Sequence, residues 1–224
     1  MTTQPILLSS AYLPPIQYVS KFLLHPSVWI EAHEHFIKQT FRNRTIILAA
    51  NGPEALIVPV EKGRSPKQKM KDLRISYDTN WPHIHWQAIV SAYNSSPFFE
   101  ILEADFRPFF EKKFDFLFDF NFQLLLVVFD ILEISPDVRF TEDFEAVPEN
   151  SLNFREAIQP KLKKSVPDPF FEPIAYTQVF DDKFGFIPNL SILDLLFNCG
   201  SASYEVLLKS NLSTEKSGKI QPGL

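Results

Sequence analysis

The chain has 224 residues, of which 45% are hydrophobic and 22% charged, a balance typical of a soluble globular protein. Its net charge of -5 does not attract nucleic acid, and its glycines form neither a G-x-G-x-x-G nor a G-x-x-x-x-G-K-[ST] phosphate loop. Cys199 is the only cysteine, which excludes an intramolecular disulfide and a cysteine-cluster metal site.

The amino-terminal residues lack the basic segment and the long apolar segment of a secretory signal. The longest apolar run, Leu124 to Phe129, is too short to span a bilayer. We therefore expect a cytoplasmic protein with no integral membrane insertion. The length predicts a single domain over residues 1–209, followed by a polar, disordered tail at 210–224.

The first elements predict the fold class. Residues 5–12 form an apolar run that ends at Leu13-Pro14-Pro15, and paired prolines end a strand but fit the first turn of a helix. Residues 16–24 carry apolar side chains at helical spacing, and residues 28–32 predict a second strand. This order predicts an α/β fold with a single mixed sheet and flanking helices.

A β-hairpin is predicted next. Apolar runs at 44–50 and 55–60 flank Asn51-Gly52-Pro53-Glu54, and Asn-Gly between such runs is a strong hairpin signal. The polar, basic residues 61–71 are typical of an exposed, mobile loop. The later pattern predicts a strand at 73–76, helices at 81–93, 98–112 and 119–132, a strand at 138–140, one short helix at 154–158 within an irregular stretch at 142–173, and a helix at 189–197 closed by Gly200.

The run from His33 to Thr45 is the densest collection of polar side chains in the sequence. Within it, Arg42, Asn43 and Arg44 stand next to Lys38 and Gln39, and two guanidinium groups can clamp a phosphate or a carboxylate bidentately. An exposed polar turn that leads into the strand is an equally good reading. The run therefore indicates where to look for an anion site.

Two His-x-His pairs, His33/His35 and His83/His85, are candidate metal or acid–base groups. Residues two apart share a face on a strand but not on a helix, so only His33 and His35 could converge, and two ligands do not complete a metal site. Surface histidines are the favoured reading, and no metal is expected. No serine lies in a G-x-S-x-G elbow, which leaves His85 as a candidate general base.

Several segments in order resemble the WbqC-like family of bacteria. They are Ala11 to Tyr18, Lys38 to Arg44, Leu56 to Val60, His85 with Tyr93 to Phe99, Asp119 to Asn121, Tyr176 to Phe180 and Pro188 to Asn198. The resemblance implies a transferase, including the suggested transfer of glycine, in a surface-polysaccharide (O-antigen) context. It places the family's polar motif positions at Tyr12, Gln17, Lys38, Asn43, Arg44, His85, Tyr93, Asn121 and Gln178.

The sequence also departs from the family pattern. His33 and His35 stand where the wider family tends to have acidic and amide residues, and a Gly-rich stretch found in longer members is absent. The first departure weakens a metal site built on both histidines. The second points to a short form of the family with altered or lost activity.

The leading hypothesis is a cytoplasmic group transferase for an activated anionic substrate, such as a nucleotide-sugar or an acyl donor, with no cofactor. His85 and Lys38 are the expected catalytic residues, with His85 as general base. The expected substrate-binding residues are Tyr12, Gln17, Arg42, Asn43, Arg44, Tyr93 and Asn121, where Arg42, Arg44 and Lys38 contact phosphates and Asn43 and Gln17 orient the acceptor.

Two other classes of function remain open. A non-catalytic binding or scaffold protein fits the missing Gly-rich stretch, and a hydrolase or metalloenzyme built on His33, His35 and Glu34 ranks last. The expected partner is a small anionic molecule and not nucleic acid, and a homo-oligomer is left open.

Overall fold

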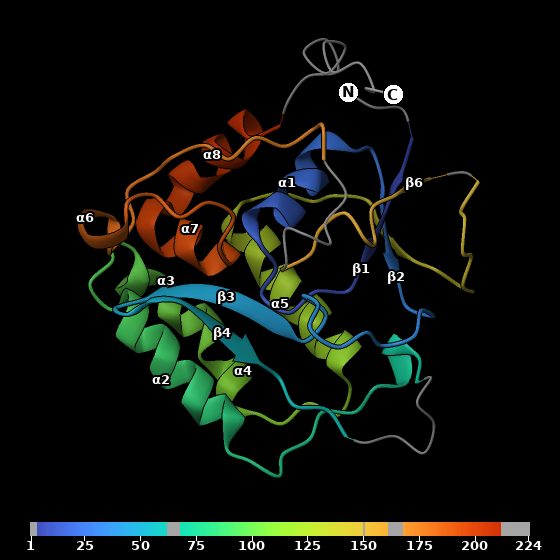
Figure 1. The fold of residues 1–224 in the computed structure, drawn as a ribbon, viewed down its shortest axis with the longest axis horizontal. Helices are drawn as coiled ribbons and strands as arrows, with labels where there is room; N and C mark the ends of the chain where they lie inside the picture. Colours follow the sequence, from blue (N-terminus) through green and yellow to red (C-terminus); the bar gives the residue numbers. More distant parts are fainter. Residues whose placement is uncertain (1–3, 62–67, 150, 161–167, 212–224) are drawn as a thin grey trace.

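A computed structural model describes residues 4–61, 68–149, 151–160 and 168–211 (Figure 1). Its main sheet is parallel, with strand order β5-β2-β1-β6. The strands are β1 (Ile6–Ser9), β2 (Val28–Glu31), β5 (Val138–Phe140) and β6 (Leu152–Asn153). A separate antiparallel hairpin joins β3 (Arg44–Ala49) to β4 (Gly52–Ile57). The predicted α/β class is confirmed, with the strands divided between these two sheets.

The order of the strands reverses once. The chain leads from β1 through α1 (Ile16–Leu24) to β2, and later through α5 (Leu117–Ile131) to β5, so each new strand is added on the same side. The connection from β5 then returns past β2 and β1 to place β6 at the opposite edge. In open parallel sheets, ligands bind beyond the carboxyl ends of the strands at such a switch point. Here that point lies between β1 and β6.

The two faces of the parallel sheet differ in character. Alternate residues of a strand point to opposite faces, and Leu8, Val28 and Ile30 belong to the main hydrophobic core. Helices α1 and α5 cover this face: Phe22 of α1 packs edge-on against Phe129 of α5, with ring centroids 4.8 Å apart. The other face is covered by the connection that follows β5, in which residues 141–149 contain no helix.

Two of the remaining helices pack against the hairpin. Helix α2 (Trp81–Tyr93) and helix α7 (Ile192–Cys199) pack against β3, and α8 (Ser203–Lys209) packs against α1 (Figure 1). Shorter elements are α3 (Phe99–Phe106), α4 (Pro108–Glu111), α6 (Asp181–Phe184) and the 3-10 turns Met70–Asp72 and Gly200–Ala202. Within the described residues, no helix combines the length and apolar character needed to cross a membrane.

Most predicted elements are present, and three differ in detail. The hairpin turns at Ala50 and Asn51, because Ala49 already pairs with Gly52, so most of the predicted break belongs to β4. The predicted helix at 98–112 is interrupted at Pro108, which cannot donate an intrahelical hydrogen bond, and divides into α3 and α4. Residues 73–76 form single bridges rather than a strand, and Ile75 pairs with Val60.

Other predictions at the carboxyl side need correction. The predicted short helix at 154–158 is wrong, because the chain there makes turns directly after β6. Helix α7 begins at Ile192 instead of residue 189, since the Ser191 side chain caps it by accepting from the Leu193 amide. Residues 62–67 of the predicted loop and 212–224 of the predicted tail lie outside the described residues. Ser210, which the predicted tail included, is buried and donates to the Val206 carbonyl.

We predict that Gly200→Ala destabilises the protein by at least about 2 kcal/mol in urea unfolding, because two costs add. Gly200 has φ +54°, and a Cβ there would lie 2.5 Å from the Phe98 ring. Gly185→Ala is the matched control: Gly185 has φ +67° with nothing within 4 Å of its Cβ position. It should lose only about 1 kcal/mol. Equal losses in both variants would contradict the close approach of Phe98.

Candidate functional site

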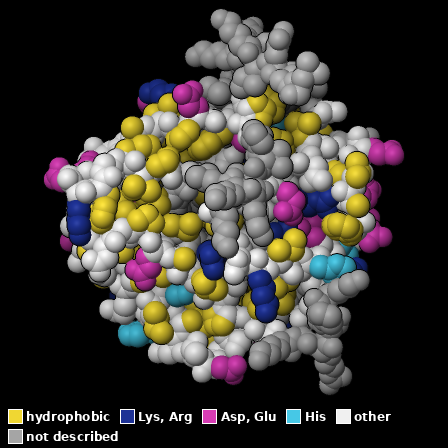
Figure 2. All heavy atoms as spheres, in the orientation of Figure 1, with side chains coloured by type: hydrophobic (Ala, Val, Ile, Leu, Met, Phe, Trp, Pro, Cys, Tyr) yellow, Lys and Arg dark blue, Asp and Glu magenta, His cyan; other side chains and the backbone are white. Residues whose placement is uncertain are grey.

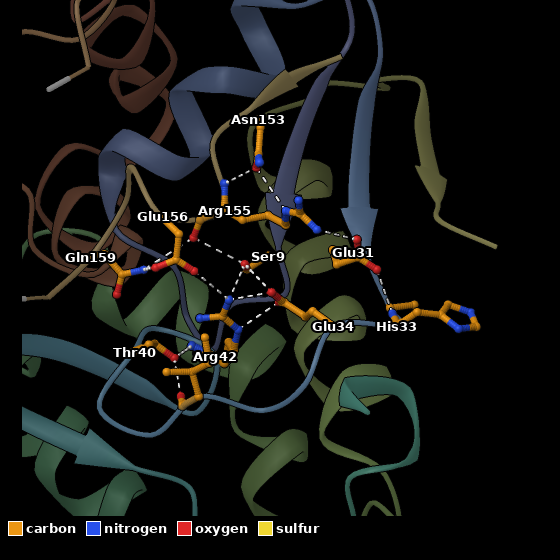
Figure 3. Close-up of polar contacts among 12 residues, drawn as sticks. Ser9, Glu31, His33, Glu34, Thr40, Arg42, Asn153, Arg155, Glu156 and Gln159 are labelled. Carbon is orange, nitrogen blue, oxygen red and sulfur yellow. Dashed lines mark hydrogen bonds and ion pairs between the residues drawn. The ribbon is translucent and has the colours of Figure 1, made fainter. Parts of the chain in front are cut away.

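A row of polar side chains crosses the sheet at its carboxyl edge, on the face that lacks helices (Figure 3). Ser9 at the end of β1 is in register with Glu31 at the end of β2. Thr141 follows β5 and donates to Glu31 Oε1 at 2.7 Å. Arg155 follows β6 and donates from Nη1 to Glu31 Oε2 at 3.0 Å. Four strand ends therefore contribute to one cluster at the switch point.

Arg42 enters the same cluster from the loop between β2 and β3. Its Nε donates to Glu34 Oε1 at 2.8 Å, and its Nη2 donates to Glu34 Oε2 at 2.5 Å. Nη2 also donates to Ser9 Oγ at 2.8 Å. The side chains of Arg42 and Glu34 are only 1% and 6% exposed. Two parallel hydrogen bonds are the geometry that best offsets the cost of burying such a charge pair.

The loop is shaped locally by its own sequence. Gln39 adopts a left-handed φ of 63°, and Thr40 donates to the Ile37 carbonyl at 2.8 Å. Asn121 of α5 donates to the Arg42 carbonyl at 2.8 Å and to Ser10 Oγ at 3.0 Å. The backbone of Arg42 is thus held from both sides, which fixes the direction of its guanidinium group.

The second buried arginine holds the covering segment onto the sheet. Arg155 donates from Nη2 to the carbonyls of Glu145 and Ala146, at 2.7 and 3.0 Å, and from Nε to Asn153 Oδ1 at 3.0 Å. Its partner Glu31 is fully buried and also accepts the His33 amide at 2.8 Å. All three nitrogens of the Arg155 guanidinium therefore donate to oxygens of the protein.

Arg42 has one weaker partner. Glu156 Oε1 lies 3.6 Å from Arg42 Nη2, and the Glu156 side chain is 60% exposed. An exposed ion pair at this distance contributes little to stability. The hollow lined by Ser9, Arg42 and Arg155 measures only about 10 Å³, which is about the space that one water molecule needs. A larger ligand reaches Arg42 only if Glu156 moves, and Glu156 is the partner least constrained by packing.

The predicted general base lies in the core instead of this cluster. The Tyr12 hydroxyl and His85 Nδ1 are 3.0 Å apart, and both side chains are buried. Burial lowers the pKa of His85 to about 4, against a smaller opposing effect of a hydrogen bond to the Ile57 backbone. The ring also packs edge-on against Trp81, with centroids 5.0 Å apart. His85 is therefore a neutral core residue at pH 7.

Two further predicted site residues support the hairpin from within. Asn43 donates to the Val58 carbonyl at 2.8 Å. The Tyr93 hydroxyl accepts the Leu48 amide at 3.2 Å and donates to Asp194 Oδ2 at 3.0 Å. These side chains fix β3 and β4 against α2 and α7, and they are separate from the cluster at the carboxyl edge.

The remaining predicted residues lie apart from one another. Lys38 is exposed on the loop. Arg44 is half-buried on β3, and its Nε has no hydrogen-bond partner in the part of the chain that the structure describes. Gln17 belongs to a second polar group, in which its Nε2 donates to Asp168 Oδ2 at 2.9 Å and the buried Lys21 pairs with the same carboxylate at 2.5 Å. Of the residues predicted for the transferase site, only Arg42 and Asn121 take part in the carboxyl-edge cluster.

Sequence analysis missed Ser9, Glu31, Arg155 and Glu156. Ser9 and Glu31 each end a predicted strand, and polar residues at that position in parallel strands are a usable signal. Arg155 and Glu156 were hidden because β6 has only two residues and residues 154–158 were predicted to be helical.

The described residues contain no group of three or more His, Cys, Asp and Glu side chains placed to hold a metal ion. His33 points away from the cluster in Figure 3, and its Nδ1 lies 3.4 Å from Lys69 Nζ. His35 is exposed and pairs through its backbone with Lys69.

Comparison with known proteins agrees with the family resemblance of the sequence motifs. The model of the WbqC-like protein family matches residues 9–166, a range that begins at Ser9 and includes every residue of the cluster. This chain belongs to the WbqC-like protein family. It is also similar to a Mycobacterium tuberculosis (strain ATCC 25618 / H37Rv) protein described as "Uncharacterized protein Rv1507c", with 25% identity over 221 residues, covering 88% of this chain and 91% of that protein. No solved structure matches.

We predict that Arg42→Met costs about 3–5 kcal/mol of stability, because it leaves Glu34 buried without a positive partner. The double variant Glu34→Leu/Arg42→Met should recover most of that loss in chemical unfolding. If the two single losses simply add in the double variant, the pair is not energetically coupled and the prediction is wrong.

A second prediction concerns pH. The folded protein keeps His85 neutral down to about pH 4, whereas the unfolded chain takes up a proton near its ordinary pKa of about 6.5. Stability should therefore be fully present above pH 6.5 and fall by up to about 3 kcal/mol as the pH drops to 4. His85→Gln should flatten this dependence, and the exposed His83→Gln should leave it unchanged. Identical pH profiles for both variants would contradict the assignment.

Proposed function

We propose that this WbqC-like protein is a group transferase that binds an activated anionic donor at the carboxyl edge of its parallel sheet. Arg42 is the anion-binding residue in this proposal. The observation that supports it most strongly is a buried guanidinium at the switch point whose only exposed partner, within the described chain, is the carboxylate of Glu156. The proposal follows the family resemblance in assigning this transfer to surface-polysaccharide biosynthesis.

The charges around Arg42 favour replacement of the Glu156 carboxylate by an oxygen of the donor. Glu34 balances Arg42 and Glu31 balances Arg155, so the four buried groups sum to zero and Glu156 adds one negative charge. A phosphate or acyl-phosphate oxygen can replace Glu156 as the negative charge beside the Arg42 guanidinium, where it can also accept a hydrogen bond from the Ser9 hydroxyl. Ser9 Oγ lies on the same nitrogen and can orient the donor.

Glu156 is then the residue available for proton transfer. Once displaced from Arg42, its exposed carboxylate stays beside the donor, where it can accept a proton from the attacking hydroxyl or amine of the acceptor. The acceptor's bond to the transferred group forms as the bond to the anionic leaving group breaks, and Arg42 stabilises the charge on that leaving group. The proposal assigns this role to Glu156 rather than to His85, whose ring is enclosed by Tyr12 and Trp81.

We predict that Glu156→Gln strengthens the binding of pyrophosphate and uridine diphosphate by about three- to tenfold in calorimetric titrations, because it removes the competing charge. Glu100→Gln, which changes an exposed carboxylate on α3, is the matched control and should bind as the wild type does. Weaker or unchanged binding in Glu156→Gln, or no anion binding to either protein, would refute the anion site.

The same variant separates an enzyme from the alternative, a non-catalytic binding protein. An enzyme should release the leaving group from a nucleotide-sugar or acetyl phosphate in the presence of an acceptor, and Glu156→Gln should lose about 10²–10⁴-fold of that rate while binding the anion more tightly. Tighter binding without turnover in the wild type would support the binding protein.

A further inference from the structure

A cavity lies beside the proposed donor site, between the sheet and the segment that covers it. It has a volume of about 480 Å³, within the range of small-molecule sites. Leu7 and Trp29 form its floor, and Arg139 lies beside them in register with Trp29. These residues point away from the helix-covered core, because Leu8, Val28 and Ile30 occupy the other face.

The rim of this cavity is acidic and unpaired. Glu142, Asp143 and Glu145 line it, all three are exposed, and none forms an ion pair with a described residue. The cationic side chains nearby are already balanced, since Arg139 pairs with Asp137 at 3.1 Å and Arg155 pairs with Glu31 at 3.0 Å. The cavity therefore keeps an excess of negative charge over an aromatic floor. In Figure 2, acidic side chains gather at the right edge, on the side where Figure 1 draws β2.

A second observation indicates a ligand with hydrogen-bonding groups. Ser151 lines the same cavity and is 9% exposed, and its Oγ has no hydrogen-bond partner among the described residues. A buried hydroxyl without a partner carries a free-energy cost that a ligand atom or water can remove. The covering segment is also anchored beside the cavity, because Arg155 binds the Glu145 and Ala146 carbonyls.

From these features we infer that the cavity binds an organic ammonium compound, with a flat or apolar part on Trp29 and its positive charge toward Glu142 and Glu145. An ammonium group is attracted both to carboxylates and to the face of an indole. A neutral polyol would gain from Trp29 but nothing from the net charge, and an anion would be repelled. Glu31 lies in both the cavity lining and the cluster around Arg155, so the two sites are adjacent.

This inference deepens the proposed function. One part of the inference rests on that function: in the transfer reaction, the bound amine is the acceptor. The bound ammonium first gives one proton to a rim carboxylate, Glu142 or Glu145, which frees the nitrogen lone pair. The nitrogen then attacks the activated group, and a bond forms between the nitrogen and the transferred group as the leaving group departs with its electron pair. The second proton passes from the nitrogen to Glu156. Binding of the amine alone does not depend on that reaction.

The test uses protein labelled with ¹⁵N-tryptophan. The chain has three tryptophans, and Trp29→Phe identifies the Trp29 indole signal. Benzylamine is positively charged at pH 7, and benzyl alcohol is its neutral match. We expect benzylamine to shift the Trp29 signal in a saturable way, and benzyl alcohol at the same concentrations to shift it much less, because the alcohol gains nothing from the carboxylates. Equal responses to both compounds, or no response to benzylamine, would overturn the inference.

Charge variants provide the second arm. Glu142→Gln/Glu145→Gln should weaken benzylamine binding by about tenfold, or about threefold for each carboxylate. The matched control Glu100→Gln/Glu172→Gln removes two exposed carboxylates elsewhere and should bind as the wild type does. Unchanged affinity in the cavity variant would overturn the inference.

The ammonium site and the donor site at Arg42 can be refuted independently of each other. If benzylamine binds as expected while Glu156→Gln shows no gain in anion affinity, the ammonium site stands and the donor site does not. If anions bind at Arg42 while benzylamine does not move Trp29, the donor site stands and the acceptor is not an amine held in this cavity.

Discussion

The parallel pairing of β1 with β2 on one side and β6 on the other is the constraint on which the site depends. It brings Ser9, Glu31 and Arg155 together from strand ends that lie far apart in the chain. Within the described residues, one face of the sheet is covered by the connection after β5 and carries no helix. That face carries both the buried charges and the cavity, so the topology decides where a ligand can bind.

Burying two arginines and two glutamates at that edge is costly for a protein of this size. Apolar side chains of similar volume would pack the same space with less loss of hydration free energy. Arg155 has a structural role that accounts for its burial, because it holds the covering segment through two carbonyls. Arg42 also contacts an exposed carboxylate that contributes little to stability. Displacement of Glu156 by the substrate explains that contact better than a contribution to stability does.

The sequence predicted those parts of the fold that depend on interactions between residues close together in the chain. Helix α1 and the α/β class follow from apolar spacing and proline placement, and Arg42 was found as part of a donor-rich run. Long-range pairing was not visible in this way. The two residues of β6 carry no pattern of their own, so Arg155 and Glu156 were missed. No residue close to His85 in the sequence indicates that its side chain is buried, because its hydrogen-bonding partner Tyr12 is 73 positions away along the chain.

The central claim is that an anionic donor replaces Glu156 on Arg42. A crystal structure of the protein grown with uridine diphosphate tests it most directly. The account predicts phosphate oxygens beside the Arg42 guanidinium and within hydrogen-bonding distance of Ser9 Oγ, the Glu34 pair intact, and the Glu156 carboxylate turned away from Arg42. Diphosphate bound elsewhere, for example at Lys38 and Arg44 with Glu156 unmoved, would contradict it.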